Sequence, residues 1–419
     1  MFKFLHAADI HLDSPLHKLD HYEGAPVEEI RQATRRTFEK LINLAIAEKV
    51  AFVLLAGDLY DGNWKDYNTG LYFASQMSKL RKAGISVYII AGNHDAASKI
   101  TKTLKLPEGV KIFSADTPET VQVDEPDVAI HGQSFASPSV KKDLSSGYPY
   151  AIEGYFNIGM LHTCVTGMEG HEPYAPCTLD GLQSRGYDYW ALGHVHKHEV
   201  LLETPLTIFP GNIQGRNIRE TGPKGCVLVT VDERRRPLAN FKPLDVIRWF
   251  EIETDVSAAE TGYDVVVIIG EHLERLLEEN QELPLVVRLK IVGDSRAHNE
   301  LASDMERWTS ELRSVAGDIS GGKIWIEKVK LHTQPPIEMM ESMSGPMAEL
   351  IQYLDELRAD PELLRTLTVD IEDLRKKLPG ELMEGEDALI LDDFDWLAGV
   401  LEEVQPMLIH CLLKEEGSK

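Results

Sequence analysis

Five short polar clusters contain the residue types that bind divalent metal ions. They are Asp9-Ile10-His11, Gly57-Asp58, Gly92-Asn93-His94-Asp95, His162 and Gly193-His194-Val195-His196. Carboxylate oxygens, an amide oxygen and imidazole nitrogens are the ligands needed by two divalent ions that share one carboxylate. Each cluster alone has an ordinary explanation, such as a turn at Gly-Asn or a helix-capping aspartate. Because five clusters occur together, a dinuclear metal site is favoured over a set of unrelated polar residues.

Each cluster follows an apolar run that predicts a buried strand. These runs span residues 2–8, 51–55, 85–91, 156–161 and 187–192. Residues two apart on an extended chain point the same way, so Asp9 and His11 can meet one point, and so can His194 and His196. Helical patterns at about 27–49 and 67–83 alternate with the first strands, which is typical of an open α/β sheet. Sites in such sheets lie beyond the carboxyl ends of the strands, where these clusters are predicted to lie.

The length and composition predict a multidomain protein of the cytoplasm. A chain of 419 residues with 43% apolar residues can form two or three domains. No apolar stretch approaches the roughly 18 to 20 residues that cross a bilayer, and the N-terminus lacks the long apolar region of a signal peptide. The four cysteines form no C-x-x-C pair, so the sequence indicates neither a zinc knot nor a disulfide framework.

The net charge of −25 argues at first against a nucleic-acid partner, because phosphate binding needs a positive surface. The charge is unevenly distributed, however. Residues 336–419 contain 21 acidic and 7 basic residues, which leaves a net charge of −11 on the rest of the chain. Metal ions would neutralise several of the site carboxylates, so the overall charge does not exclude DNA.

The sequence predicts three domains or segments. Residues 1–243 form the domain with the metal clusters. Residues 244–334 read as a small βαβαβ capping domain without such clusters, with helices near 263–279 and 298–315, and Gln334-Pro335-Pro336 follows as a linker. Residues 335–419 are predicted to be an acidic helical segment, broken at Leu378-Pro379-Gly380, that docks a protein partner.

The order of the motifs resembles the calcineurin-like metallophosphoesterases. Within that family the sequence is most similar to the SbcD-type DNA repair exonucleases, and more closely to the YhaO-like bacterial branch. The similarity is carried by residues 9–15, 57–61, 192–196 and 210–226, and it covers residues 1 to about 240. It implies a four-layer α/β/β/α sandwich, followed by a small α+β capping domain and a helical C-terminal segment.

The resemblance also implies a role for each residue of the clusters. One metal ion would be held by Asp9, His11, Asp58 and His196, and the other by Asp58, Asn93, His162 and His194, with Asp58 bridging. His94 would stand over the scissile phosphate, oriented by Asp95. Manganese is the ion that the resemblance implies, and the spacing of the ligands is also compatible with iron, zinc or magnesium. Two such cations activate a water molecule and offset the charge of the phosphate, and a protonated His94 can assist the leaving oxygen.

Three basic residues beyond the last metal motif are candidates for contact with substrate phosphates. They are Arg216, Arg219 and Lys224. The alternative is a loop that forms salt bridges with Glu220, and the sequence favours neither interpretation.

The function implied by the resemblance is a dinuclear-metal-dependent DNA exonuclease, with endonuclease as a second activity, in double-strand-break repair. Such subunits form homodimers and bind an SbcC-type coiled-coil ATPase. The apolar stripes around Leu350, Leu354, Leu357 and Leu363-Leu364 are predicted to provide the helix-binding face. Two alternatives stay open: a metallophosphoesterase that acts on small molecules or phosphoproteins, and a non-enzymatic DNA-end tether.

Overall fold

The computed structural model describes residues 1–14, 27–61, 67–97, 106–165, 175–281, 283–336 and 346–367, with single residues and short pieces between 394 and 412. The chain divides into two compact units. Unit 1 comprises residues 1–250 and 283–286, and unit 2 comprises residues 251–282 and 287–419. None of the described helices combines the length and the apolar character needed to cross a membrane.

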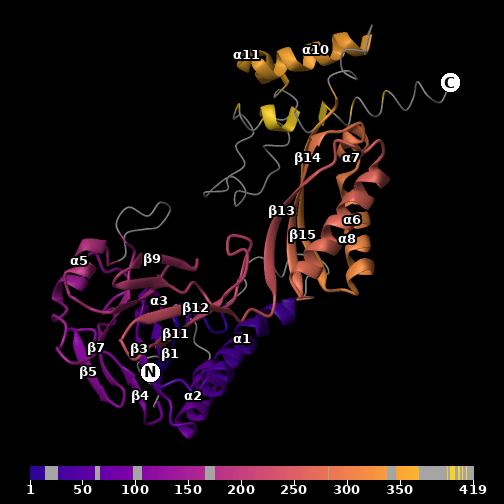
Figure 1. The fold of residues 1–419 in the computed structure, drawn as a ribbon. Helices are drawn as coiled ribbons and strands as arrows, with labels where there is room; N and C mark the ends of the chain where they lie inside the picture. The colour runs from indigo at the N-terminus through magenta and orange to yellow at the C-terminus, as the bar shows by residue number, and fades with distance from the viewer. Residues whose placement is uncertain are drawn as a thin grey trace. The chain divides into compact units, whose positions relative to one another are not determined.

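Unit 1 contains two six-stranded sheets (Figure 1). The first has the order β12 (Pro237–Pro243), β11 (Gly225–Val231), β1 (Phe2–Ala7), β2 (Phe52–Ala56), β3 (Ser86–Ile90) and β4 (Val110–Ile112). The second has the order β5 (Glu119–Asp124), β6 (Asp127–Gly132), β7 (Phe156–His162), β8 (Tyr189–Gly193), β10 (Leu206–Phe209) and β9 (Glu199–Glu203). Strands β1 to β4 are mutually parallel, as are β6, β7, β8 and β10.

The two sheets pack face to face, and helices cover their outer faces. Phe4 of β1 points into the core between the sheets, whereas Leu5 points to the opposite face. That opposite face packs against α1 (Val27–Ala47) and α2 (Tyr67–Lys82) through residues such as Phe38 and Phe73. On the second sheet, Trp190 packs against Leu182 of α5 (Leu179–Gln183). The α/β/β/α sandwich predicted from the sequence is confirmed.

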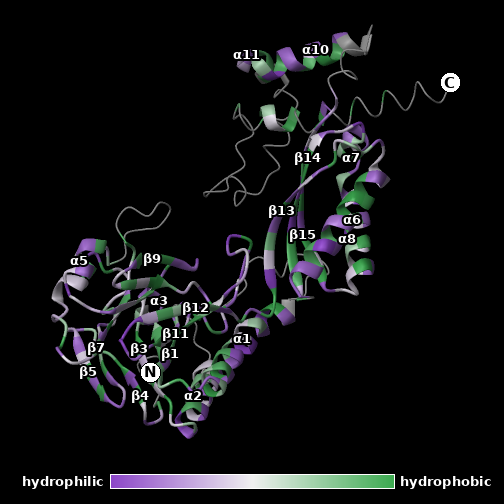
Figure 2. Cartoon of the chain, in the orientation of Figure 1, coloured by the Kyte–Doolittle hydropathy of each residue, from purple (hydrophilic) through white to green (hydrophobic). Residues whose placement is uncertain are grey.

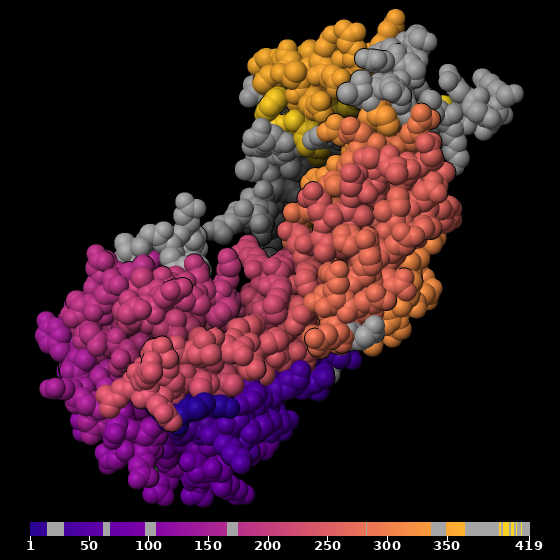
Figure 3. Space-filling view, in the orientation of Figure 1, coloured from indigo at the N-terminus to yellow at the C-terminus, as the bar shows by residue number. Residues whose placement is uncertain are grey.

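The outer strands of the sheets were not predicted from apolar runs. In β12 partly buried and exposed residues alternate, and Leu238 is 71% exposed. This strand lies at the edge of the first sheet and on the surface of unit 1 seen in Figure 3. Strands β5 and β9 at the edges of the second sheet are similarly half-exposed. The apolar residues of such strands are few or form only a short run, so the sequence gives a weak strand signal.

A three-stranded sheet consists of β13 (Arg248–Asp255), β14 (Leu285–Asp294) and β15 (Ile324–Gln334), and most of its residues belong to unit 2. Three helices accompany it: α6 (Gly262–Glu279), α7 (His298–Ser303) and α8 (Met305–Ser320). Helices α6 and α8 are amphipathic and carry both apolar and polar residues (Figure 2). The sequence predicted one helix near 298–315. The structure has two, because Asp304 leaves helical geometry and caps α8 by accepting a hydrogen bond from the amide of Arg307.

The described part of the C-terminal segment contains α10 (Pro346–Ala359) and α11 (Pro361–Leu367). Leu354, Leu357 and Leu364 are buried and pack with Leu397 and Leu401. Part of the predicted helix-binding stripe is therefore covered by the chain itself. The predicted break at residues 378–380 lies outside the described residues.

Candidate metal centre

The carboxyl ends of strands from both sheets bring together the seven predicted metal ligands. The first sheet contributes Asp9 and His11 after β1, Asp58 after β2 and Asn93 after β3. The second sheet contributes His162 at the end of β7, and His194 and His196 after β8. The sequence prediction that these side chains meet at one edge therefore agrees with their positions in the structure.

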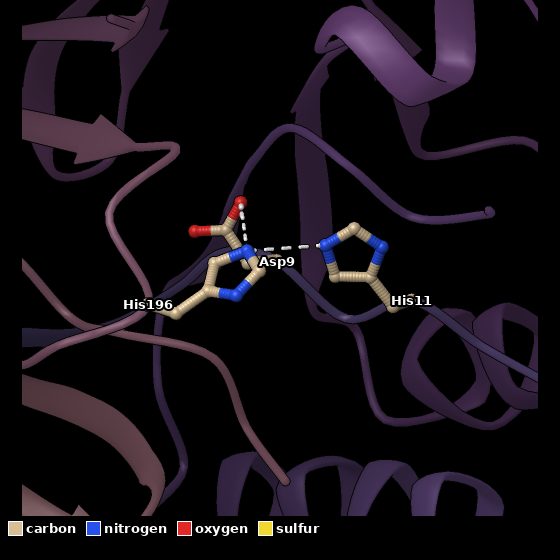
Figure 4. A group of neighbouring side chains, drawn as sticks. All are labelled: Asp9, His11 and His196. Carbon is tan, nitrogen blue, oxygen red and sulfur yellow. Dashed lines mark hydrogen bonds and ion pairs between the residues drawn. The ribbon is translucent and has the colours of Figure 1, made fainter. Parts of the chain in front are cut away.

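One ligand group consists of Asp9, His11 and His196, which offer ligand atoms within 4.8 Å of one another. Nε2 of His11 lies 3.3 Å from Nε2 of His196, and the latter lies 3.9 Å from Oδ1 of Asp9 (Figure 4). Two imidazole nitrogens this close repel unless a proton or a cation lies between them. The donor set therefore fits a divalent ion.

A second group consists of Asp58, His162 and His194, also within 4.8 Å of one another. Nε2 of His162 lies 3.3 Å from Oδ2 of Asp58 and 3.0 Å from Oδ1 of Asn93. The same Oδ2 of Asp58 is 4.0 Å from Nε2 of His11, a member of the first group. Asp58 thus lies between the two groups, where one carboxylate can serve both.

Hydrogen bonds to the second ring nitrogen orient two of the histidines. His162 donates from Nδ1 to the carbonyl oxygen of Ala56 at 2.9 Å, and His196 donates from Nδ1 to Oε1 of Glu220 at 2.8 Å. In each ring the hydrogen bond from Nδ1 fixes the orientation, so that Nε2 faces the carboxylates, as a metal ligand requires. Burial alone lowers the pKa of His162, but the neighbouring Asp58 carboxylate raises it to about 9.

The backbone turns sharply where the strands end. Asp9, His11 and Asp58 have φ angles of 51°, 44° and 54°, in the left-handed region that non-glycine residues rarely adopt. Residues held in such conformations cluster at functional sites, because the surrounding structure must compensate for the strain. His194, with a φ angle of 106°, is a fourth predicted ligand of this kind, although positive φ angles also occur in turns away from the site, as at Lys49 and Arg235.

A glycine in the third motif permits close approach of the ligands. A Cβ atom at Gly92 would lie 2.3 Å from Oδ1 of Asp58 and 2.8 Å from the ring of His162. No real side chain tolerates these distances, so any other residue here would displace the ligands. This explains why glycine precedes Asn93 in the sequence.

His94 stands beside the two groups and contacts Asp61. Its Nδ1 lies 2.8 Å from Oδ1 of Asp61, and its ring centroid is 4.9 Å from that of His11. The imidazole is 39% exposed, so a substrate can reach it. The hydrogen bond to Asp61 raises the pKa of His94 above its ordinary value. This favours the protonated ring that a general acid requires.

The prediction that Asp95 orients His94 is wrong. Asp95 is buried and accepts hydrogen bonds from the backbone amides of Leu59, Tyr60 and Gly92 at 2.9 to 3.1 Å. Both residues belong to the short helix α3 (Asn93–Ala97), in which neighbouring side chains point about 100° apart. Asp95 therefore joins the loop after β2 to the loop after β3. Burial, reinforced by the charge of Asp58, raises the pKa of Asp95 to about 7.

The three basic candidates for phosphate contact have different surroundings. Arg216 donates from Nη2 to Oε1 of Glu220 at 2.9 Å, as the salt-bridge alternative predicted. Lys224 is buried and donates from Nζ to the carbonyl oxygen of His196 at 2.7 Å. Arg219 is exposed. Of the three, Arg219 has the side chain most open to a substrate.

Asp61 and Glu220 contact site imidazoles, but the sequence interpretation gave them no role in the site. Asp61 could have been found, because it follows Asp58 by three residues within the second motif. Glu220 is separated from His196 by 24 residues, and its position depends on the course of the loop that carries it. No spacing rule would have identified it.

Comparison with known proteins matches both parts of the chain. Residues 2–198 match the family described as calcineurin-like phosphoesterase, and residues 249–334 match the middle domain of metallophosphoesterase YhaO. The uncharacterized metallophosphoesterase YhaO of Bacillus subtilis is 37% identical over 294 residues, which cover 69% of this chain and 71% of that protein. The DNA double-strand break repair protein Mre11 of Sulfurisphaera tokodaii is 30% identical over 209 residues, which cover 47% of this chain and 50% of that protein.

Among solved structures, a dimetal phosphatase from Danio rerio aligns with a TM-score of 0.34 and 11% identity, over 57% of this chain and 99% of that one. At that TM-score the structural likeness adds nothing to the assignment, which depends on the sequence matches. Given the similarity to YhaO over most of both chains, the protein belongs to the YhaO-type calcineurin-like metallophosphoesterases and is a metal-dependent phosphoester hydrolase.

Proposed function

We propose that this chain is a DNA exonuclease, with endonuclease as a second activity, that uses two manganese ions to hydrolyse phosphodiester bonds. The observation that carries the proposal is the position of Asp58 between two ligand groups, with His94 beside them. A pair of divalent ions activates water and neutralises a phosphate at such a site. Oxygen and nitrogen ligands of this kind are compatible with manganese.

The residue roles follow from the two groups. Asp9, His11, Asp58 and His196 would hold one ion, and Asp58, Asn93, His162 and His194 would hold the other. His94, kept protonated by Asp61, would donate a proton to the leaving oxygen or stabilise the transition state. None of these steps requires a nucleophilic serine or cysteine.

DNA is the proposed substrate because several similar proteins are named DNA double-strand break repair protein Mre11, at 23 to 30% identity. By the same likeness we propose a homodimer that works in double-strand-break repair with an SbcC-type ATPase. Residues 244–334 would cap the nuclease domain of residues 1–243. A metallophosphoesterase of small molecules or phosphoproteins would use the same ligands, so the first experiment must separate the two substrate classes.

The first experiment is digestion of end-labelled linear duplex and single-stranded DNA by the purified protein in manganese. We expect a product ladder that requires the metal, is abolished by EDTA, and falls at least about 100-fold in His94→Asn, as expected for loss of a general acid. His332→Asn, which changes an exposed histidine of unit 2, is the matched control and should digest DNA at the wild-type rate.

A phosphomonoester, p-nitrophenyl phosphate, is assayed in parallel. If DNA stayed intact both with the protein alone and with the ATPase partner, while the monoester was cleaved, the DNA proposal would be wrong and the metal assignment would stand. If a metal-free variant held DNA ends and still supported repair, the chain would be a tether instead of a nuclease.

We further propose that residues 335–419 dock the ATPase through apolar side chains that the C-terminal helices leave exposed. Tyr353 is 54% and Leu363 is 40% exposed, whereas Leu354, Leu357 and Leu364 pack within the segment. The acidic surroundings would limit this face to a partner that also carries basic groups.

The docking proposal is tested with Tyr353→Asp combined with Leu363→Asp in the full chain. We expect binding to the ATPase to weaken at least about tenfold, because charges replace apolar contacts at an interface. Leu238→Asp, on the exposed edge strand β12, controls for a charge placed elsewhere on the surface. Unchanged ATPase binding in the double variant would exclude this face as the docking site.

A further inference from the structure

The guanidinium of Arg216 lies between two carboxylates at the edge of the metal centre. Its Nη2 donates to Oε1 of Glu220 at 2.9 Å, and its Nη1 is 3.7 Å from Oδ2 of Asp61. Nη1 also lies 3.4 Å from the hydroxyl of Ser14, which itself hydrogen-bonds Asp61. The arginine thus connects two acidic residues that lie far apart in the sequence.

Each of these carboxylates orients a different imidazole of the site. Glu220 accepts the Nδ1 proton of His196 at 2.8 Å, and His196 belongs to the first ligand group. Asp61 contacts Nδ1 of His94 at 2.8 Å, and His94 is the proposed general acid. A displacement of Arg216 would therefore disturb the orientation of both a metal ligand, His196, and the proposed proton donor, His94.

We propose that Arg216 is a positioning residue that joins the carboxylate holding His196 to the carboxylate holding His94. The inference depends on the metal assignment proposed above. It replaces the expectation that Arg216 binds a substrate phosphate, and it leaves that role to Arg219. In this role Arg216 keeps His196 and His94 in a fixed position relative to each other.

The hydrogen bonds of Glu220 support this role. Glu220 is buried and accepts from the side-chain amide of Asn212 at 2.9 Å and from the backbone amide of Arg216 at 2.8 Å, besides its bonds to the guanidinium and to His196. A buried carboxylate with this many donors is held rigidly. It can therefore fix the ring of His196 in one orientation.

The exposure of Arg216 argues against a direct phosphate contact. Its side chain is 16% exposed, and the N–H groups of its guanidinium point at acceptors of the chain itself. A phosphate could bind it only by displacing Glu220 or Asp61, which would leave a buried carboxylate without its cation. Arg219, three residues further on, is exposed and does not carry this cost.

The planar fork of arginine is what this position requires. One guanidinium can donate separate N–H groups to Glu220 and to Ser14, which bonds Asp61, whereas a lysine ammonium is a point charge on a flexible stem. Arg216→Lys therefore keeps the positive charge but loses the link between Glu220 and the Asp61 side of the site. Glu220→Gln breaks the same connection from the other end and keeps the side-chain size.

The experiment compares these two variants with Arg219→Gln and with Arg234→Gln, an exposed arginine in the turn between β11 and β12. Manganese binding is measured by equilibrium dialysis with metal analysis. Binding of a single-stranded oligonucleotide is measured over a range of salt concentrations. Unfolding temperatures in EDTA test whether each variant is folded.

We expect Arg216→Lys and Glu220→Gln to bind one of the two manganese ions about 10- to 100-fold more weakly, as loss of a group that orients a ligand does in other metal sites. Their salt dependence of oligonucleotide binding should match wild type. Arg219→Gln should show the reverse, with normal manganese binding and a salt slope reduced by about 0.7, the value for one phosphate contact on a single strand. Arg234→Gln should change neither.

Two results would overturn the inference. If Arg216→Lys and Glu220→Gln were folded and bound both manganese ions as wild type does, Arg216 would not position the centre, and the proposed nuclease function would be untouched. If the wild-type chain bound fewer than two ions, the metal assignment would be wrong, and the inference would fall with it.

Discussion

Asp58→Asn should abolish binding of both manganese ions, whereas Asn93→Ala should weaken only one. Oδ2 of Asp58 lies 3.3 Å from Nε2 of His162 and 4.0 Å from Nε2 of His11, so one carboxylate faces both ligand groups. Oδ1 of Asn93 lies 3.0 Å from Nε2 of His162, a member of the second group. We expect the manganese content of wild type to be about two ions per chain, and metal analysis after dialysis should find close to none in Asp58→Asn.

The unfolding temperatures of the same variants should show how much of the stability comes from bound manganese. A ligand at 100 times its dissociation constant stabilises a folded protein by about 2.7 kcal/mol per site. Manganese should therefore raise the unfolding temperature of wild type strongly, that of Asn93→Ala less, and that of Asp58→Asn not at all. Calorimetric scans with and without manganese measure the difference.

In EDTA we expect Asp58→Asn to unfold at a temperature close to that of wild type. Asp58 faces two other buried carboxylates, Asp9 and Asp95. Burial raises the pKa of each, and the charge of Asp58 raises it further. Asparagine relieves this repulsion and can still accept from the amide of His94, but it also removes the attraction between the carboxylate and His162. These effects oppose each other, so the net change in unfolding temperature should be small. If Asp58→Asn kept one ion at wild-type affinity, Asp58 would not bridge the two groups.

The ligands could be predicted from the sequence because each cluster follows a largely apolar run. A strand buried on both faces leaves an unmistakable run such as residues 51–55, and the polar residues after it must lie at the sheet edge. The outer strands β5, β9 and β12 escaped prediction because only one of their faces is covered. The sequence therefore predicted the central strands of each sheet and the ligands, but not the edge strands β5, β9 and β12.

The residues that orient the ligands could not be predicted in the same way. The contact between Glu220 and His196 depends on how the loop after β10 folds back, which no local pattern encodes. The assignment of Asp95 failed for the opposite reason. Adjacency to His94 suggested a contact, but consecutive residues of a helix do not face each other, and Asp95 instead accepts backbone amides.

Asp61→Asn and Asp95→Asn should have different effects at saturating manganese. Asp61 contacts the ring of His94 at 2.8 Å, so its charge is expected to keep that ring oriented and protonated. We expect Asp61→Asn to reduce kcat for DNA by about 100-fold, the usual contribution of a general acid. KM should change little, and both manganese ions should remain bound.

A second substrate tests whether the loss lies in proton donation. In bis(p-nitrophenyl) phosphate the leaving group is a stable anion that needs little protonation, whereas DNA releases an alkoxide. Asp61→Asn should therefore hydrolyse the nitrophenyl diester at a rate much closer to wild type than it hydrolyses DNA. Equal losses on both substrates would mean that Asp61 acts on the metal ligands, for example through His11, whose Nδ1 is 3.7 Å away.

Asp95→Asn should affect stability more than chemistry. Oδ2 of Asp95 accepts from the amide of Gly92 at 3.1 Å, and Oδ1 accepts from Leu59 and Tyr60. Asparagine would place an N–H group against one of these donors, which costs about 1–3 kcal/mol at a buried site. A lower unfolding temperature with nearly normal kcat per folded molecule is expected. If Asp95→Asn instead matched Asp61→Asn in its selective loss of DNA cleavage, the proton donor would depend on Asp95 after all.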